Sequence, residues 1–170
     1  MFKKFLLAVL VAAPMCLAAQ NVKLGYLNSQ EIFNVMPEKA TAENTLKTAS
    51  DRYETEFKNL QTAFQQKLEK YDAESKDANT PQAIKDRHQQ ELQDEYNKIQ
   101  NFQQTAQQDL QKQQDQLLAP ITQKLQDAIK AVGAEGGFTF IYDLSIPSVV
   151  YTGNGAEDIT AKVKAKLGIK

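Results

Sequence analysis

The amino-acid sequence predicts an α+β fold, mostly α, in which a long antiparallel helical hairpin is inserted into a small β-rich body. Residues 38–132 contain almost no glycine or proline, as two long helices require. Short segments rich in β-forming residues flank this region on both sides. A hairpin of this length cannot bury both of its faces, so we expect it to be an arm that extends from the body.

Residues 1–19 have the features of a secretory signal peptide. Two lysines precede the apolar stretch 5–13, which is too short to span a membrane, and small residues follow it. The alternative is a lipoprotein acylated at Cys16, which Pro14 and Met15 disfavour because lipoprotein cleavage requires small side chains before the cysteine. We therefore expect export in soluble form, without stable membrane insertion.

The remaining chain offers little for catalysis or for nucleic-acid binding. From residue 20 onward it carries 18 basic and 21 acidic side chains, whereas nucleic-acid binding requires a basic excess. Removal of Cys16 leaves no thiol for a disulfide, a zinc site or a nucleophile. His88, the single histidine, lies on the apolar stripe of the predicted arm, and we interpret it as a tolerated stripe position rather than a metal ligand. We expect no enzyme activity, cofactor or metal.

The N-terminal part of the body is predicted to contain a strand and a short helix. Residues 22–27 begin with the alternation of a strand that buries one face. Asn28 suits the N-cap of a helix over residues 29–35, with Glu31 at the capping-box position. Pro37 suits the first turn of the next helix, which we expect to reach about residue 78.

The arm is predicted from apolar residues that recur at steps of three and four. We expect Thr80 to cap the return helix and Pro81 to begin it. With the turn near residues 79–81, facing residues have numbers that sum to about 160, so that Phe64 meets Tyr96. The residues predicted to pack the hairpin together are Tyr53, Phe57, Leu60, Phe64, Leu68, Leu92, Tyr96 and Ile99.

The C-terminal part of the body is predicted to contain a β-hairpin and a helix. Three glycines within residues 133–137 end the return helix. Residues 138–142 and 148–152 read as two strands joined as a hairpin. The last helix is expected over residues 156–167, with Glu157 in its first turn, where a carboxylate suits the helix dipole.

These elements divide the chain into a discontinuous body, residues 20–44 with 120–170, and an arm, residues 45–119. A sheet of three strands is barely stable alone, so we expect the body to associate with other copies and bury its sheet edges. The body residues expected to pack across subunits are Val22, Leu24, Tyr26, Phe138, Phe140, Val149 and Tyr151.

The arm is rich in glutamine, with sixteen between residues 45 and 119, and the same stretch holds 10 basic and 13 acidic residues. Two interpretations of the glutamines stay open. They form a solvated helix face with few charges, or they form an adaptable surface that contacts varied polypeptides.

Several segments, most of them near the two ends of the mature chain, form a recognisable set: Gly25-Tyr26-Leu27, Asn28 to Met36, Leu118-Ala119-Pro120-Ile121, Phe140-Ile141-Tyr142-Asp143, Val149-Val150-Tyr151 and Asp158-Ile159-Thr160. In these segments the chain resembles the Skp (OmpH-like) family of periplasmic chaperones, so we expect the exported protein in the periplasm. The resemblance implies a homotrimer whose helical arms surround a cavity, where unfolded outer-membrane β-barrel proteins are held without ATP and kept from aggregating. It implies no catalytic residues. The best-known members are strongly basic, with cationic arm tips and a proposed lipopolysaccharide-binding patch. This arm is slightly acidic, so we do not transfer lipopolysaccharide binding to it. The rival hypothesis is an envelope adaptor whose hairpin docks a partner.

Overall fold

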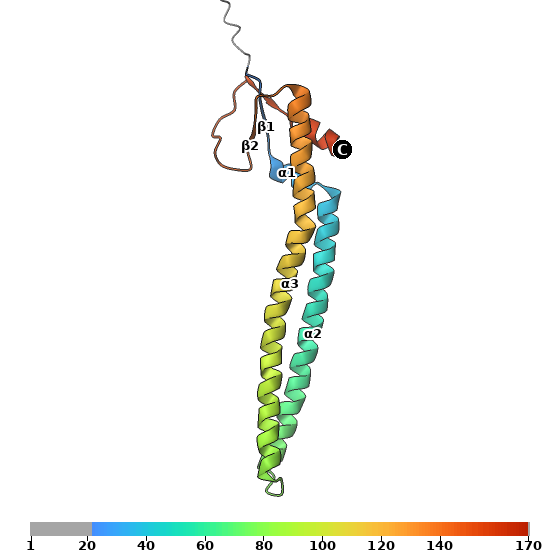
Figure 1. Ribbon diagram of the computed structural model, residues 1–170, viewed down its shortest axis with the longest axis vertical. Helices are drawn as coiled ribbons and strands as arrows, with labels where there is room; N and C mark the ends of the chain where they lie inside the picture. The colour runs from blue at the N-terminus through green and yellow to red at the C-terminus, as the bar shows by residue number, and fades with distance from the viewer. Residues whose placement is uncertain (1–21, 170) are drawn as a thin grey trace, which may run out of the picture.

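The computed structural model describes residues 22–169, so the predicted signal peptide, residues 1–19, lies outside the described residues. The described chain is a long helical hairpin with a small sheet and two short helices at one end (Figure 1), as the sequence predicts. The elements in chain order are β1 (Leu24–Leu27), α1 (Ser29–Asn34), α2 (Pro37–Lys76), α3 (Gln82–Gly136), β2 (Phe140–Asp143), β3 (Ala156–Asp158) and α4 (Thr160–Lys166).

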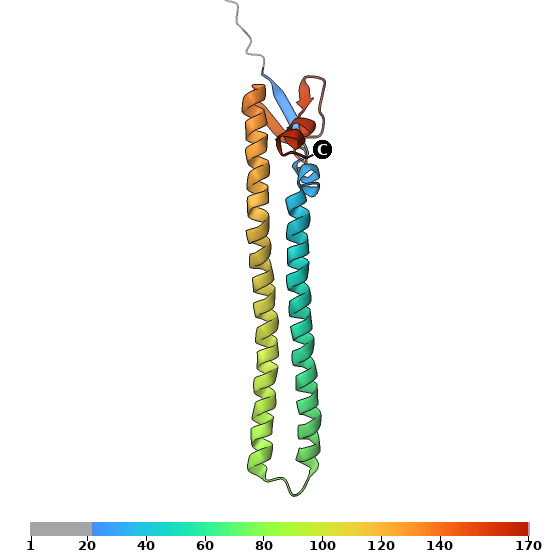
Figure 2. The same cartoon turned by 90° about the vertical axis from the view of Figure 1, so that its right-hand side faces the viewer.

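The two long helices lie side by side for most of their length, as the perpendicular views in Figure 1 and Figure 2 show. Helix α2 has 40 residues and α3 has 55, so α3 extends beyond the start of α2 and passes beside the sheet. At about 1.5 Å per residue, α2 alone is roughly 60 Å long. The hairpin is therefore much longer than the body to which it is attached.

The start of α1 confirms the predicted cap. The backbone N–H of Glu31 donates to Asn28 Oδ1 at 3.1 Å, which satisfies one of the unpaired donors of the first helical turn. Helix α1 ends at Asn34, and Pro37 is the first residue of α2, where its missing N–H is not needed. The Glu31 carboxylate forms an ion pair with Lys164 Nζ at 2.9 Å, which joins α1 to α4.

The turn at the far end of the arm differs slightly from the prediction. Helix α3 begins at Gln82, because Pro81 is in the extended N-cap position and no side chain caps the helix. Thr80 is therefore not the cap. Lys85 Nζ instead donates to the carbonyl oxygens of Ser75 and Asp77, at 2.7 and 3.0 Å, and so binds the last carbonyls of α2.

The C-terminal end of α3 follows the predicted glycine pattern. Gly137 has a φ of +65°, a left-handed conformation that glycine adopts without steric cost. The N–H of Phe138 donates to Gly133 O at 3.0 Å, which is the 6→1 hydrogen bond of a Schellman motif. Gly136 closes the helix, and this end directs the chain back toward β1.

The sheet is parallel, with strand order β2-β1-β3 and β1 in the centre. The predicted β-hairpin is therefore wrong, and so is the predicted strand over residues 148–152, which are irregular. The third strand is Ala156–Asp158, the segment that the prediction assigned to the first turn of the last helix. Helix α4 begins only at Thr160, whose N–H donates to Asp158 Oδ1 at 2.9 Å.

Burial explains why the third strand lies where it does. The segment 156–158 pairs with β1 and delivers Ile159 to the core, where its N–H donates to Tyr26 O at 2.9 Å. Ile159 is fully buried, whereas Val150 and Tyr151 in the irregular segment are 100% and 83% exposed. Residues 148–152 favour a strand locally, but no strand within residues 22–169 supplies them with hydrogen-bond partners.

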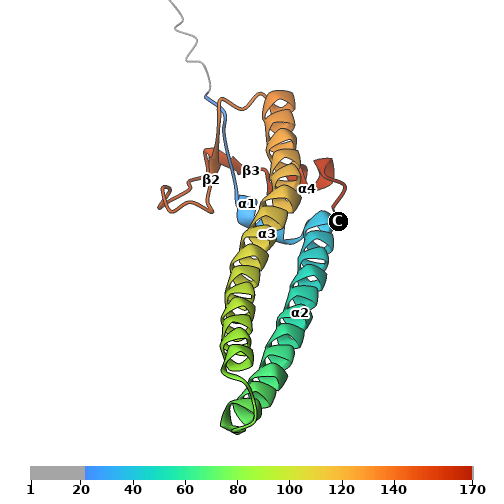
Figure 3. The ribbon, with the colours of Figure 1, turned by 60° about the horizontal axis from the view of Figure 1, so that its bottom comes forward.

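One small core joins the two ends of the chain. It lies between the inner face of the sheet, α1, α4, the start of α2 and the last third of α3, which Figure 3 shows gathered at one end of the hairpin. Its members come from before residue 43 and after residue 120, so the arm is an insertion between the two halves of this core. The buried members are Leu27, Ile32, Met36, Ala42, Ile121, Leu125, Ala128, Val132, Ile159 and Val163.

Candidate binding surfaces on the arm and the sheet

The two arm helices meet through a row of aromatic contacts. Phe64 and Tyr96, whose numbers sum to 160, have ring centroids 6.4 Å apart. Nearer the body, Tyr53 meets Phe102 edge to face at 6.0 Å. These pairs hold α2 against α3 at several points along the arm.

The apolar stripe of the arm is only partly covered by this packing. Leu68 and Tyr96 are 39% and 49% exposed, although both belong to the predicted contact stripe. Ile99 is buried, and the other predicted residues are half-buried. Two helices cannot enclose a stripe that a bundle of three or four would bury. The arm therefore presents apolar side chains along its length to any partner that lies against it. The half-buried residues are Tyr53, Phe57, Leu60, Phe64 and Leu92.

Polar contacts between the helices flank the aromatic ones. Tyr53 OH donates to Asp109 Oδ2 at 2.6 Å, and this hydrogen bond raises the pKa of Tyr53 and lowers the pKa of Asp109. Lys67 Nζ lies 2.6 Å from Glu95 Oε1, and this bond lowers the pKa of Glu95. The spacing of apolar residues in the sequence could not predict these contacts, because the groups that form them are polar and lie at the edges of the apolar stripe.

Several of the charges on the arm are paired with neighbours on the same helix. Lys47 pairs with Asp51 at 2.9 Å and Lys70 with Glu74 at 3.9 Å, each along one helix. Several glutamines also donate to side chains four residues away on their own helix, which agrees with the solvated-face interpretation for those positions. The glutamines with such bonds are Gln65, Gln82, Gln90, Gln93, Gln111 and Gln113.

The outer face of the sheet is a second apolar surface. The parallel register sets Leu24 beside Phe140 and Tyr26 beside Tyr142, and these four side chains share the face that points away from the core. Phe140 and Tyr142 are 57% and 45% exposed. We call this surface, with the adjoining irregular segment, the outer sheet face.

A groove of about 360 Å³ lies on the outer sheet face. Of the predicted body residues, Leu24, Tyr26, Val149 and Tyr151 line it. Tyr142 also lines it and was missed, although the alternation with Phe140 along one strand could have indicated it. The groove is open, so it forms part of a surface rather than an enclosed ligand cavity.

Two of the predicted body residues lie elsewhere. Phe138 packs against the core, with Lys23 Nζ 4.1 Å from its ring centroid. Its position after Gly137 turns it inward, whereas Phe140, two residues later, begins the strand and faces outward. Val22 precedes β1 and is 54% exposed.

The described residues hold no group of three or more side chains arranged to bind a metal ion. Within residues 22–169, no helix combines the length and the apolar character that crossing a membrane requires. His88 is buried at the far end of the arm, where its ring stacks on Tyr71 with centroids 4.0 Å apart.

Comparisons with known proteins agree on one family. The model of the outer membrane protein (OmpH-like) family matches residues 23–167. The chaperone protein Skp of Yersinia enterocolitica is 29% identical over 164 residues, which cover 95% of this chain and 96% of that protein. An OmpH-like outer membrane chaperone structure from Caulobacter crescentus superposes with a TM-score of 0.73 at 20% identity, covering 85% of this chain and 82% of that one, and so shares the fold. Because the family match spans most of its length, this chain belongs to the OmpH-like family.

Proposed function

We propose that this protein is a periplasmic chaperone that holds unfolded outer-membrane β-barrel proteins without ATP and prevents their aggregation. The observation that carries the proposal is the long arm with a half-exposed apolar stripe, attached to a separate small core. Membership of the OmpH-like family and the name of the Yersinia relative support it. The proposal includes no catalysis, no cofactor and no lipopolysaccharide binding.

The working form is a homotrimer. The body comprises residues 20–44 and 120–170, the arm comprises residues 45–119, and the outer sheet faces of three bodies pack together. The exposed Phe140 and Tyr151 support this arrangement, since a monomer would leave large apolar side chains in water. The outer edges of β2 and β3 would also lack partners in a single chain. Sedimentation equilibrium that gives a monomer at micromolar concentration would contradict the trimer.

Three arms would then surround one client. Each arm offers weak apolar contacts, and three linked arms convert them into tight binding through effective concentration. Such a mechanism needs no single deep pocket and accepts unfolded chains of different sequence. This mechanism agrees with an apolar stripe whose half-buried and exposed members follow one another along the arm.

The test is an aggregation assay in which a β-barrel protein, unfolded in urea, is diluted into buffer with or without this protein. The full protein should keep the client soluble, and a variant with residue 45 joined to residue 119 by a short linker should form the oligomer but not hold the client. A double substitution, Leu68→Gln with Tyr96→Gln, should weaken holding, while Gln104→Ala on the exposed part of α3 should not. Holding by the arm-deleted variant would overturn the role of the arm.

The competing hypothesis is an envelope adaptor whose hairpin docks one partner. An adaptor would bind that partner stoichiometrically and would not suppress aggregation of unrelated unfolded barrels. The aggregation assay therefore separates the two functions.

A further inference from the structure

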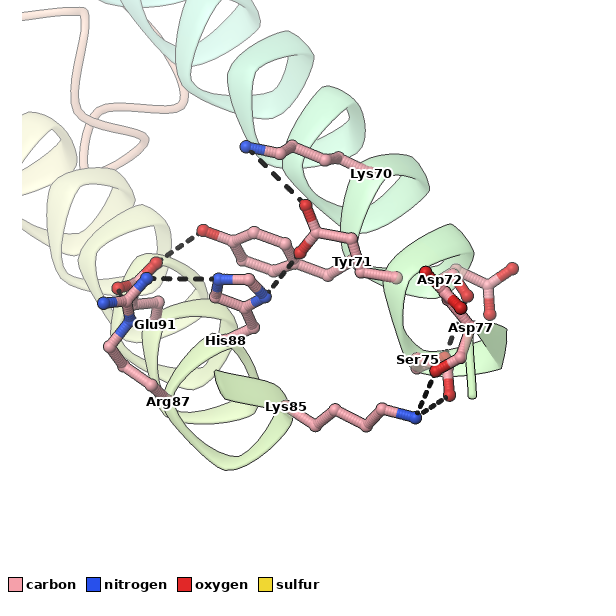
Figure 4. Close-up of polar contacts among 10 residues, drawn as sticks. Lys70, Tyr71, Asp72, Ser75, Asp77, Lys85, Arg87, His88 and Glu91 are labelled. Atoms are coloured by element: carbon pink, nitrogen blue, oxygen red, sulfur yellow. Dashed lines mark hydrogen bonds and ion pairs between the residues drawn. The ribbon is translucent and has the colours of Figure 1, made fainter. Parts of the chain in front are cut away.

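The far end of the arm contains a cluster of polar side chains around the single histidine of the protein (Figure 4). His88, from α3, is 8% exposed and lies between groups from both helices. Its Nε2 is 3.3 Å from Arg87 Nη2, and its Nδ1 is 2.7 Å from Glu74 Oε2 on α2. Tyr71 of α2 stacks on the ring and donates its OH to Glu91. A histidine that merely filled an apolar stripe would not require these partners.

The contact with Arg87 identifies the ring nitrogen that lacks a proton. A guanidinium can only donate, so a hydrogen bond from Arg87 Nη2 requires His88 Nε2 to be an acceptor. The imidazole is then neutral, with its proton on Nδ1, the atom that faces Glu74. When Nε2 gains a proton, two donors that both carry positive charge face each other, and the contact cannot persist.

The contact with Glu74 favours the opposite protonation state. Glu74 Oε2 is buried and accepts no well-aligned hydrogen bond, even though Nδ1 lies within bonding distance. A buried carboxylate oxygen in this condition is costly, and a positive charge on the adjacent ring would compensate it. Lys70 Nζ, at 3.9 Å from the other oxygen of Glu74, compensates it only weakly.

Arg87 already has a second partner. Its Nε lies 3.3 Å from Glu91 Oε1, and its side chain is 62% exposed, so it can leave His88 and remain paired. The hydrogen bond from Tyr71, together with the nearby positive charge of Arg87, lowers the pKa of Glu91, so this carboxylate stays ionised when the histidine titrates. The other charged residues at this end have partners of their own. Lys85 binds the carbonyls of Ser75 and Asp77, Asp72 pairs with Lys76, Asp86 accepts from Gln82, and Asp77 accepts from Asn79.

We propose that the arm end is a proton-operated contact: neutral His88 holds Arg87, and uptake of one proton at Nε2 releases Arg87 and converts the His88–Glu74 contact into an ion pair between α2 and α3. Histidine ordinarily changes charge between about pH 5 and 8, and this is the range in which the exchange is to be sought. It adds one positive charge to the arm end and frees a guanidinium there.

The composition of the chain makes the test direct. The sequence has one histidine and two arginines, Arg87 and Arg52, the latter lying exposed in the middle of α2. NMR of full-length mature protein, labelled with nitrogen-15 in histidine and arginine and prepared without a polyhistidine tag, therefore shows one imidazole and two guanidinium groups. At pH 8 the ring should be protonated on Nδ1. Between about pH 8 and 5, the Arg87 signals should shift with the same midpoint as the His88 ring, and those of Arg52 should stay constant.

Two substitutions should move the midpoint of the His88 titration in opposite directions. Glu74→Gln removes the opposite charge and should move it to lower pH, whereas Arg87→Gln removes the like charge and should move it to higher pH. Arg52→Gln is the matched control and should leave it unchanged. A ring protonated on Nε2 at pH 8, constant Arg87 signals, or shifts of one sign in both variants would overturn the proposal. The wild-type tautomer and the coupled Arg87 shift decide it even where a variant fails to fold.

Discussion

Ile159 is the residue whose truncation should most directly test how the two ends of the chain form one core. It is fully buried beside Leu27 and Ile32 in the core and follows directly after β3. Ile159→Ala removes three carbon atoms, worth about 0.8 kcal/mol each, or roughly 2.4 kcal/mol of transfer free energy. The unfilled volume adds to this loss, so we expect a total of about 3–4 kcal/mol, within the usual range of roughly 2–5 kcal/mol for such changes.

The assay is urea unfolding, followed by far-ultraviolet circular dichroism and by tyrosine fluorescence at one protein concentration, because association makes stability concentration-dependent. Ile146 provides a matched control, since it lies 59% exposed in the segment after β2. Ile146→Ala should change the free energy of unfolding by less than about 0.5 kcal/mol. Ile159→Val should lose only about 0.5–1.5 kcal/mol. Equal stability of the two alanine variants would refute the placement of β3 and the core built upon it.

Three further predictions concern the end of α3, acid stability and salt. Gly136→Ala would place a Cβ in steric conflict with the Phe138 ring, and displacement of that ring should cost about 1–3 kcal/mol in thermal or urea unfolding. Gly155→Ala, whose added Cβ meets nothing within 4 Å, should be nearly neutral. The pKa values of Asp109 and Glu91 are lowered in the folded protein by hydrogen bonds from Tyr53 and Tyr71, so their contribution is present above about pH 4 and is lost as pH falls through the folded-state pKa values. The urea midpoint of the arm should therefore fall in acid, and Asp109→Asn should reduce that dependence; an unchanged pH profile would contradict it. Because the arm carries 10 basic and 13 acidic residues and so offers no basic excess, affinity for an unfolded barrel protein, measured by fluorescence titration, should change less than about threefold between about 50 and 500 mM NaCl. A loss of about tenfold or more would show that clients are captured electrostatically.

The sequence by itself determined the features that depend on neighbours a few residues away. The spacing of apolar residues located both long helices, and Asn28, Pro37 and Gly137 marked ends that the structure reproduces. Each of these features follows from backbone hydrogen bonds or dihedral angles within one turn of helix, so local sequence is sufficient to indicate it.

Only the tertiary structure decided the features that depend on contacts between distant segments. The strand propensity of residues 148–152 was overridden, because the edge of β1 accepts Ala156–Asp158, which carries Ile159 into the core. Phe138 and Phe140 look alike in sequence, yet the end of α3 turns one inward and the other outward. His88 gained its polar partners only when α2 placed Glu74 and Tyr71 beside it, since pairing across the hairpin is fixed by packing rather than by local pattern.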